Sequence, residues 1–508
     1  MTRRLLLCIG ILILAAWGQP VLAGSYLQAF EDKVTAFSLE NGLRFLVIER
    51  HQAPVVSFVT FVNTGSVDEP RGQTGIAHLF EHLAFKGTPN IGTSNWELEQ
   101  TLLDRVDAAY TQWLQAKYRD QTDEAQLTTL RDRFETLRAE ARQFVVPNAF
   151  AKIIEKNGGT DLNAATARDY TMYFCSLPAN RIELWFSLES DRLLHPVFRE
   201  FYTEKQVVLE ERRMRVDSNP TGRLIEELLT QAYQAHPYRT PTIGWTTDIV
   251  ATTRADLRSF FEQYYRPGNL TVAIAGDVDP ERIKTLARTY FGSMKTRETT
   301  LPIITREPSQ RGERQFTHRG PNQPVYLEAY HTVAQSHPDS PALDILSDIL
   351  SRGRVSRLYR SLVEDAGLAQ HIQTFNGFPG DQYPSLFVVY AVPRQNAEVD
   401  ELVAALHTEL SQIKKQGISQ EELERAKTRL RADLVRNLRS NLGLARRLAR
   451  AEAQEGGWRQ PFTYLDRLQR IDPAMIRRAA NDYLLRENRT AGRMLYQAQP
   501  GDKSGRDE

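Results

Sequence analysis

The most informative stretch of this chain occupies residues 75–88 and reads GIAHLFEHLAFKGT. Its apolar residues surround two histidines and a glutamate, which predicts a buried or half-buried helix. Residues four apart share one face of a helix, so His78 and His82 can direct both imidazoles at one point, with Glu81 beside them. Two neutral imidazoles suit Zn²⁺, which then needs a third protein ligand and an open position for water. The pattern predicts a metal site in which Glu81 acts as general base on a zinc-bound water.

The order His-x-x-Glu-His matches the inverted zinc-peptidase motif. A pair of histidines at this spacing occurs on many helices, so the alternative is a polar helix face whose His and Glu have no role. The glutamate between them and the apolar flanks argue against that alternative. Zinc is the default metal, because the ligand types alone do not distinguish it from other divalent ions.

Composition narrows the class of protein. The chain has 508 residues, 41% of them hydrophobic, which implies two or more domains with real cores. Two cysteines exclude a disulfide scaffold, and the apolar content excludes a disordered chain. The 64 Lys and Arg are balanced by 63 Asp and Glu, and this near-neutral charge argues against a dedicated nucleic-acid binder.

The first 23 residues have the three parts of a secretory signal peptide: basic residues, an apolar run and small residues before Gly24. Cleavage would leave a formal charge of −1 and Cys175 as the single cysteine. We therefore expect an exported, periplasmic protein; if the segment is not cleaved, it would tether the same protein to a membrane. No other apolar run is long enough for a stable membrane span.

The rest of the chain divides into two halves of similar texture. Both contain strand-like alternation and apolar helical patterns. Strands are expected at 43–48, 55–62, 269–276, 325–330 and 385–392, and a helix at 341–350. These patterns predict an α+β protein with two structurally similar domains, at 24–297 and 313–497, each with a mixed or antiparallel sheet flanked by helices. A linker is expected at 298–312 and a disordered tail at 498–508.

A helical insertion is expected in the first domain at about 96–145. Apolar residues recur there at helical spacing among many charges, and residues 120–123 read as a turn. The pattern predicts a long antiparallel helical hairpin. It is either a solvated structural insertion or a contact surface for a partner subunit.

Further motifs appear downstream in a fixed order. They read GGTDLNAAT at 158–166, DYTMYF at 169–174, EKQVVLEERRM at 204–214, HPY at 236–238 and YYRPGN at 264–269. With the metal helix, they resemble the pitrilysin/insulinase family of zinc metallopeptidases. The resemblance covers essentially the whole mature chain. It is specifically to the short-chain branch that includes the mitochondrial processing peptidase and bacterial relatives.

The resemblance implies roles for several residues. The third ligand of the single zinc ion would be Glu211, with its neighbour Glu210 as the competing candidate. Glu204 lies seven residues earlier on the same helix face and suits a carboxylate that holds a ligand histidine by its other nitrogen. Asn163 and Ala164 match the segment near the substrate cleft, on a strand edge that can bind an extended peptide. The alternative for Asn163 is a turn former after two glycines.

The second half departs from the family pattern. Relatives carry an Arg and a Tyr seven residues apart that contact the substrate backbone and the transition-state oxygen. Here the matching positions are Val363 and Gln370, which cannot supply those donors. We therefore expect a zinc-dependent endopeptidase subunit, half of a clamshell chamber. Its partner would be a related subunit that lacks the zinc motif and carries the Arg/Tyr pair. A homodimer is not distinguished by the sequence, and the alternative function is a non-catalytic, core-like assembly subunit of the same fold.

Overall fold

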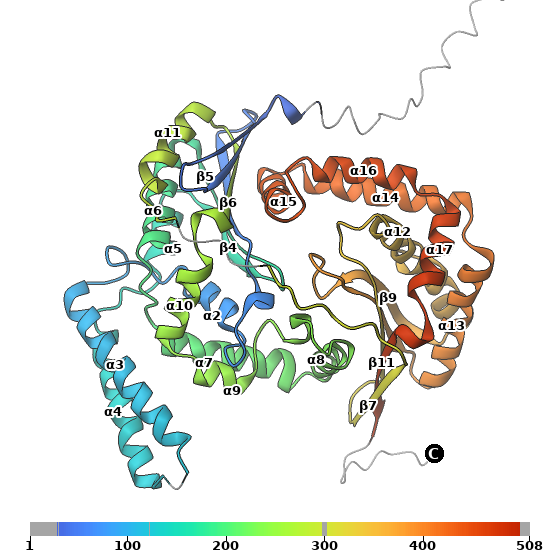
Figure 1. The fold of residues 1–508 in the computed structure, drawn as a ribbon, viewed down its shortest axis with the longest axis horizontal. Helices are drawn as coiled ribbons and strands as arrows, with labels where there is room; N and C mark the ends of the chain where they lie inside the picture. The colour runs from blue at the N-terminus through green and yellow to red at the C-terminus, as the bar shows by residue number, and fades with distance from the viewer. Residues whose placement is uncertain (1–27, 29, 121, 297–301, 498–508) are drawn as a thin grey trace, which may run out of the picture.

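The computed structural model describes residues 28, 30–120, 122–296 and 302–497 (Figure 1). The predicted signal peptide, the start of the predicted linker and the predicted tail lie outside these residues. The described part of the linker, residues 302–312, forms neither helix nor strand. Within the described residues, no helix is long and apolar enough to cross a membrane.

The first sheet is built from strands rich in β-branched and aromatic residues, the types that fit a pleated, buried surface. Strand β3, for example, reads VVSFVTFV, and seven of its eight residues are buried. Within the described residues the sheet has six strands in the order β1-β2-β6-β3-β5-β4. Its strands are β1 (Val34–Ser38), β2 (Arg44–Glu49), β3 (Val55–Val62), β4 (Thr160–Thr166), β5 (Thr171–Pro178) and β6 (Leu270–Gly276).

The second sheet repeats this arrangement. The described residues give it five strands in the order β7-β11-β8-β10-β9. Its strands are β7 (Arg314–Gly320), β8 (Val325–His331), β9 (Ala369–Phe378), β10 (Leu386–Pro393) and β11 (Arg489–Tyr496). Both sheets contain one parallel pair, β2 with β6 and β7 with β11, and their remaining pairs are antiparallel. The two domains therefore share one topology, as the sequence predicted, and β1 is an addition to the first.

Helices flank both sheets. Those of the first half are α2 (Ile76–Leu83), α3 (Trp96–Lys117), α4 (Glu124–Arg142), α5 (Ala149–Lys156), α6 (Ile182–Leu194), α7 (Phe201–Arg212), α8 (Pro220–Ala232), α9 (Thr246–Ala251), α10 (Arg254–Tyr264) and α11 (Pro280–Phe291). Those of the second half are α12 (Ser340–Ser351), α13 (Val399–Gln416), α14 (Gln420–Asn437), α15 (Asn441–Gln454), α16 (Gln460–Arg470) and α17 (Pro473–Tyr483).

The two halves exchange one helix each. Helix α8 belongs to the first half but packs on β8 and β11 of the second sheet. Helix α15 belongs to the second half but packs on β3 and β6 of the first sheet, and Figure 1 shows it beside that sheet. Buried Leu444 and Leu448 of α15 share a core with Val59 and Phe61 of β3. Each half therefore completes the core of the other.

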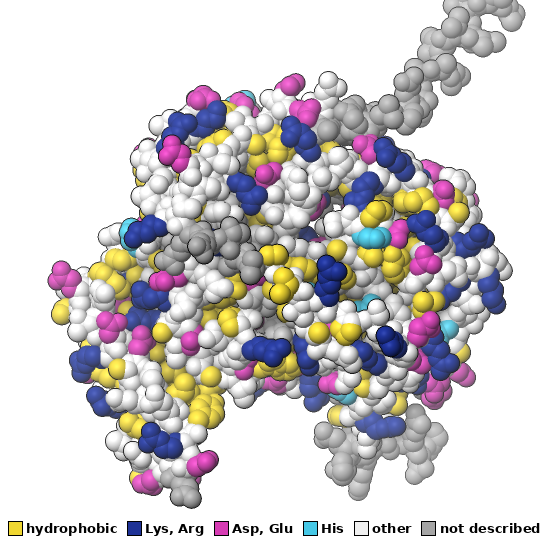
Figure 2. All heavy atoms as spheres, viewed as in Figure 1, with side chains coloured by type: hydrophobic (Ala, Val, Ile, Leu, Met, Phe, Trp, Pro, Cys, Tyr) yellow, Lys and Arg dark blue, Asp and Glu magenta, His cyan; other side chains and the backbone are white. Residues whose placement is uncertain are grey.

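The predicted helical hairpin consists of α3 and α4, which pack along each other and project from the first domain (Figure 1). The Asn95 side chain accepts a hydrogen bond from Leu98 N and caps α3, and Asp123 caps α4 in the same way. Basic and acidic side chains are interspersed over the face shown in Figure 2, in keeping with the near-neutral charge of the chain.

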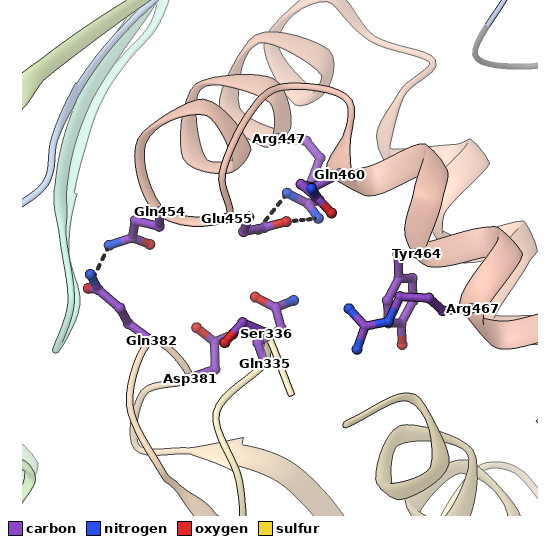
Figure 3. A pocket seen from close by; sticks show the side chains of 10 residues that line it. All are labelled: Gln335, Ser336, Asp381, Gln382, Arg447, Gln454, Glu455, Gln460, Tyr464 and Arg467. Carbon is purple, nitrogen blue, oxygen red and sulfur yellow. Dashed lines mark hydrogen bonds and ion pairs between the residues drawn. The ribbon is translucent and has the colours of Figure 1, made fainter. Parts of the chain in front are cut away.

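A polar cavity of about 200 Å³ lies beside α15 and α16 in the second half (Figure 3). Its Arg447 and Glu455 pair with each other at 2.8 Å, and its Gln454 donates to Asn63 Oδ1 at 3.0 Å in the first half. The charges of this cavity are thus largely satisfied within the protein. None of the candidate site residues lines it.

Candidate metal centre

Helix α2 is fixed at its N-terminus by the partly buried carboxylate of Glu69 and by two glycines. Glu69 accepts hydrogen bonds from Gly75 N at 2.8 Å and Ala77 N at 2.9 Å, two donors that a helix start leaves unpaired. Gly75 has φ +86°, and a Cβ there would lie 2.6 Å from Ile243 O, so only glycine fits. Gly244 lies against it. The start of α2 is therefore held in one position.

Helix α2 presents His78 and His82 to α7, which carries Glu211. Glu211 Oε2 lies 3.7 Å from His78 Nε2 and 3.4 Å from His82 Nε2. The two imidazole rings are 4.8 Å apart between centroids and nearly perpendicular. A tetrahedral zinc ion with bonds of about 2.0–2.1 Å separates its ligand atoms by roughly 3.3–3.4 Å. The observed spacing is close to that value.

The donor set fits a metal such as zinc. Within the described residues, His78, His82 and Glu211 are the one group of three His, Cys, Asp or Glu whose ligand atoms lie close enough to hold an ion, all within 4.8 Å. Two imidazole nitrogens and one carboxylate oxygen are zinc ligands, and three protein ligands leave a position open. The competing Glu210 has a half-exposed side chain that pairs with Arg213 at 2.8 Å instead.

Burial and a hydrogen bond shift the pKa values of His78, Glu81 and His82. Burial, with the neighbouring His82, lowers the pKa of His78 to about 3, so this imidazole is neutral at pH 7 and free to act as a ligand. The hydrogen bond with Glu204 raises the pKa of His82. Burial raises the pKa of Glu81, which suits a carboxylate that must take up a proton. A metal ion held by His78, His82 and Glu211 would compete with a proton for the His82 imidazole.

Glu204 lies two turns before Glu211 on α7. Its Oε2 is 3.4 Å from His82 Nδ1, the nitrogen that faces away from Glu211. This is the arrangement in which a carboxylate fixes the tautomer of a ligand histidine. The Nδ1 atom of His78 is buried and has no hydrogen-bond partner among the described residues.

Asn163 and Ala164 lie on β4, an edge strand of the first sheet that contacts α2. Asn163 is exposed, and its Oδ1 accepts a hydrogen bond from Ala164 N at 2.8 Å. Among the described residues, the outer side of β4 has no neighbouring strand. An extended chain can therefore pair there, directly beside the helix that carries the histidines.

Val363 and Gln370 lie in the second half. Val363 is buried in the helical turn Tyr359–Asp365, and its carbonyl accepts a hydrogen bond from Arg394 Nη2 at 3.2 Å. Gln370 is exposed on β9, where its Oε1 accepts from Gln323 Nε2 at 2.7 Å. Neither side chain carries a charge or a phenolic hydroxyl.

Two basic residues that the sequence analysis did not single out contact the carboxylates of this site. Lys86 Nζ lies 2.6 Å from Glu204 Oε1, and Arg215 Nη1 lies 2.8 Å from Glu211 Oε1. Arg215 is four residues after its partner Glu211, and this i, i+4 spacing is the signal by which the sequence could have indicated it. Lys86 lies beyond the end of α2 and reaches a residue of another helix, so no local spacing indicates its contact with Glu204.

Two mixed sheets in one topology, with His-x-x-Glu-His on a helix facing a glutamate, define a metallopeptidase-type fold and site. The family comparison agrees. Residues 44–141 and 143–245 match the model of the insulinase family, peptidase family M16, and residues 251–430 match the M16 inactive domain. The chain belongs to peptidase family M16.

Relatives match along most of their length. The zinc protease PqqE of Helicobacter pylori is 30% identical over 87% of both chains. A probable mitochondrial-processing peptidase subunit beta from Schizosaccharomyces pombe is 24% identical over 92% of both. The crystal structure of a protease from Helicobacter pylori superposes with a TM-score of 0.76 at 27% identity, covering 91% of this chain and 99% of that one.

Proposed function

We propose that this chain is the zinc-bearing subunit of an endopeptidase that hydrolyses peptides or unfolded segments. The observation that carries the proposal is the convergence of His78, His82 and Glu211, with Glu81 on the same helix as the two histidines. Homologues named zinc proteases support the chemistry. One zinc ion per chain is expected.

Each residue then has a chemical task. Zinc in this site would acidify a coordinated water and polarise the scissile carbonyl. Glu81, whose pKa burial raises, takes the proton and returns it to the leaving amine. The β4 edge at Asn163 and Ala164 binds the substrate as an added strand, so that backbone hydrogen bonds supply affinity with little sequence preference.

A partner would complete the site. Val363 and Gln370 do not supply an Arg/Tyr donor pair, so a related subunit with such a pair and no zinc motif would stabilise the developing oxyanion in a heterodimer. The two chains would close as a clamshell. The periplasmic protease PqqL of Escherichia coli supports this arrangement by its length. This chain covers 48% of the PqqL chain, so PqqL is long enough for about two units of this size. That likeness, at 18% identity, concerns the fold alone.

The location is also part of the proposal. A leader at residues 1–23 would export the chain to the periplasm, or would tether it to the membrane if it is not removed. N-terminal sequencing of the protein from membrane and soluble fractions distinguishes the two. A chain starting at Gly24 supports export and cleavage.

The test combines metal analysis with a peptide assay. The purified chain should contain close to one zinc per molecule, and unstructured peptides should be cleaved only when the Arg/Tyr-bearing partner is added. Chelation should abolish this activity and zinc should restore it. Strong zinc-dependent cleavage by the chain alone would refute the heterodimer. A wild-type chain that binds no zinc would favour the assembly subunit of the same fold.

A further inference from the structure

A lysine that directly follows the metal helix contacts the carboxylate that supports one of the two histidines. Lys86 Nζ lies 2.6 Å from Glu204 Oε1 and 3.5 Å from Glu200 Oε2. The other oxygen of Glu204 lies 3.4 Å from His82 Nδ1. Glu204 therefore bridges an ammonium group and an imidazole, with one oxygen for each.

The backbone of Lys86 is itself fixed by a buried guanidinium. Arg199 Nη1 donates to Lys86 O at 2.9 Å and to Ile91 O at 3.0 Å, and its Nη2 donates to Thr88 O at 3.2 Å. Glu99 at the base of the helical hairpin pairs with Arg199 at 2.5 Å, and both side chains are fully buried. Because the loop after α2 is built around this ion pair, Lys86 reaches Glu204 from a rigid position.

The two histidines are supported differently. His78 Nδ1 has no hydrogen-bond partner among the described residues, whereas His82 Nδ1 has Glu204. A histidine that binds a metal through Nε2 needs its Nδ1–H directed at an acceptor, which fixes both tautomer and ring orientation. A carboxylate tied to a cation by its second oxygen provides that acceptor in one orientation.

We propose that Lys86 is a positioning residue for the metal site. It holds Glu204 in place, and Glu204 orients His82 toward the ion. The inference rests on the proposed zinc site and deepens it, because it identifies the cation on which the geometry of one ligand depends. Outer groups of this kind typically change metal affinity by about 10–100-fold when they are removed.

The test measures zinc affinity of the full chain by competition with a chromogenic chelator, without substrate. Lys86→Met keeps the length of the side chain and removes its charge, and should weaken zinc binding about 10–100-fold. Lys86→Arg should restore most of the affinity. Lys284→Met is the matched control, because Lys284 is equally exposed and pairs with Glu281 at 2.5 Å on α11; it should leave the affinity unchanged.

A double variant shows whether Lys86 acts through Glu204. If it does, Lys86→Met combined with Glu204→Gln should bind zinc no more weakly than Glu204→Gln alone. The visible spectrum of the Co²⁺-substituted protein should change in Lys86→Met and return in Lys86→Arg. Thermal unfolding of the metal-free variants controls for loss of fold, and a destabilised Lys86→Met is replaced by Lys86→Gln in the same series.

The outcomes separate the two proposals. Wild-type zinc affinity in Lys86→Met, or additive losses in the double variant, would overturn the role of Lys86 and leave the zinc site intact. A wild-type chain without zinc affinity would overturn the zinc site and the role of Lys86 together.

Discussion

The two halves of the molecule place a helix at the same point of the same topology and use it differently. Helix α2 follows β3 and faces α7, and α12 follows β8 and faces α14. On α2, two imidazoles converge with a carboxylate of α7. On α12, Asp348 pairs with Arg429 of α14, and Ser347 and Ser351 contact Thr374 of β9 at 3.0 and 2.8 Å.

The difference shows what the fold supplies and what side chains supply. In the second half each buried carboxylate has a guanidinium or a hydrogen-bond donor beside it, as a buried charge requires. In the first half, the imidazoles of His78 and His82 converge instead with the carboxylate of Glu211, in a donor set that suits a metal ion. The topology positions two helices face to face in both halves, but among the described residues only the first half brings together a donor set that fits a metal.

The largest expected effect is on catalysis at α2. Glu81→Gln keeps the shape of the side chain but removes the base, so the partner-supported peptidase activity should fall by about 10²–10⁴-fold. Zinc content should stay at one per chain. Ser347→Ala on α12 is the control in the other half and should leave activity within about twofold. Peptide cleavage and metal analysis of the same preparations give both readouts.

Either of two results would contradict the proposed difference between α2 and α12. Activity that survives Glu81→Gln would remove the catalytic distinction between α2 and α12. Loss of zinc in the same variant would show that Glu81 holds the metal.

The next largest effect is on the stability of the second half. Asp348 is 2% exposed, and Arg429 Nε donates to it at 2.9 Å. Arg429→Met leaves the buried carboxylate with the more distant Arg352, at 3.5 Å, and should lower the free energy of unfolding by about 3 kcal/mol, the low end for breaking a buried ion pair. The double variant with Asp348→Asn should recover part of the loss. Urea unfolding measures both.

Arg436→Met on the same helix is the matched control, because Arg436 is exposed and should change stability by less than about 0.5 kcal/mol. Zinc affinity should not change in any of these variants. A loss below about 1 kcal/mol for Arg429→Met would mean that the Asp348–Arg429 pair does not stabilise the contact between α12 and α14.

Much of this arrangement can be predicted from the sequence. The features that cannot be predicted depend on how distant parts of the chain pack. The bounds of β3 and the helical hairpin come from periodicity, which local residues determine. Periodicity does not predict that α8 and α15 pack on the sheet of the other half, because an apolar helix face fits either sheet. The choice between Glu210 and Glu211 depends on helix phase, since one residue rotates a side chain by about 100°. The contact of Lys86 with Glu204 depends on how two helices pack.

A smaller effect distinguishes the starts of the two helices. Burial raises the pKa of Glu69, which caps α2, to about 8, from an ordinary value near 4.5. The folded state then binds the proton more tightly than the unfolded chain, so this group lowers stability as pH rises from about 4.5 to 8. Glu69→Gln should reduce the decline between pH 5 and 8.5 by at least about 1 kcal/mol.

Unfolding free energies of both proteins at the two pH values provide the measurement. Asp339→Asn, before α12, is the control, because its carboxylate pairs with Arg478 at 2.7 Å near the surface. The same decline in wild type and Glu69→Gln would show that the cap of α2 carries no pH-dependent cost.

The smallest expected effect concerns the α3–α4 hairpin, which has no counterpart among the described residues of the second half. Replacing residues 114–127, the distal end of the α3–α4 hairpin, by a short Gly-Ser turn should leave zinc affinity within about twofold. The reason is that the hairpin is joined to the metal region at its base: Tyr110 Oη donates to Val250 O at 2.6 Å, and Glu99 pairs with Arg199. Glu99→Gln, at that base, should weaken zinc binding more than the truncation does.

Two other outcomes of the truncation are informative. If it removes zinc, the distal hairpin supports the metal site. If it removes only partner-dependent cleavage, the hairpin is the surface that contacts the second subunit.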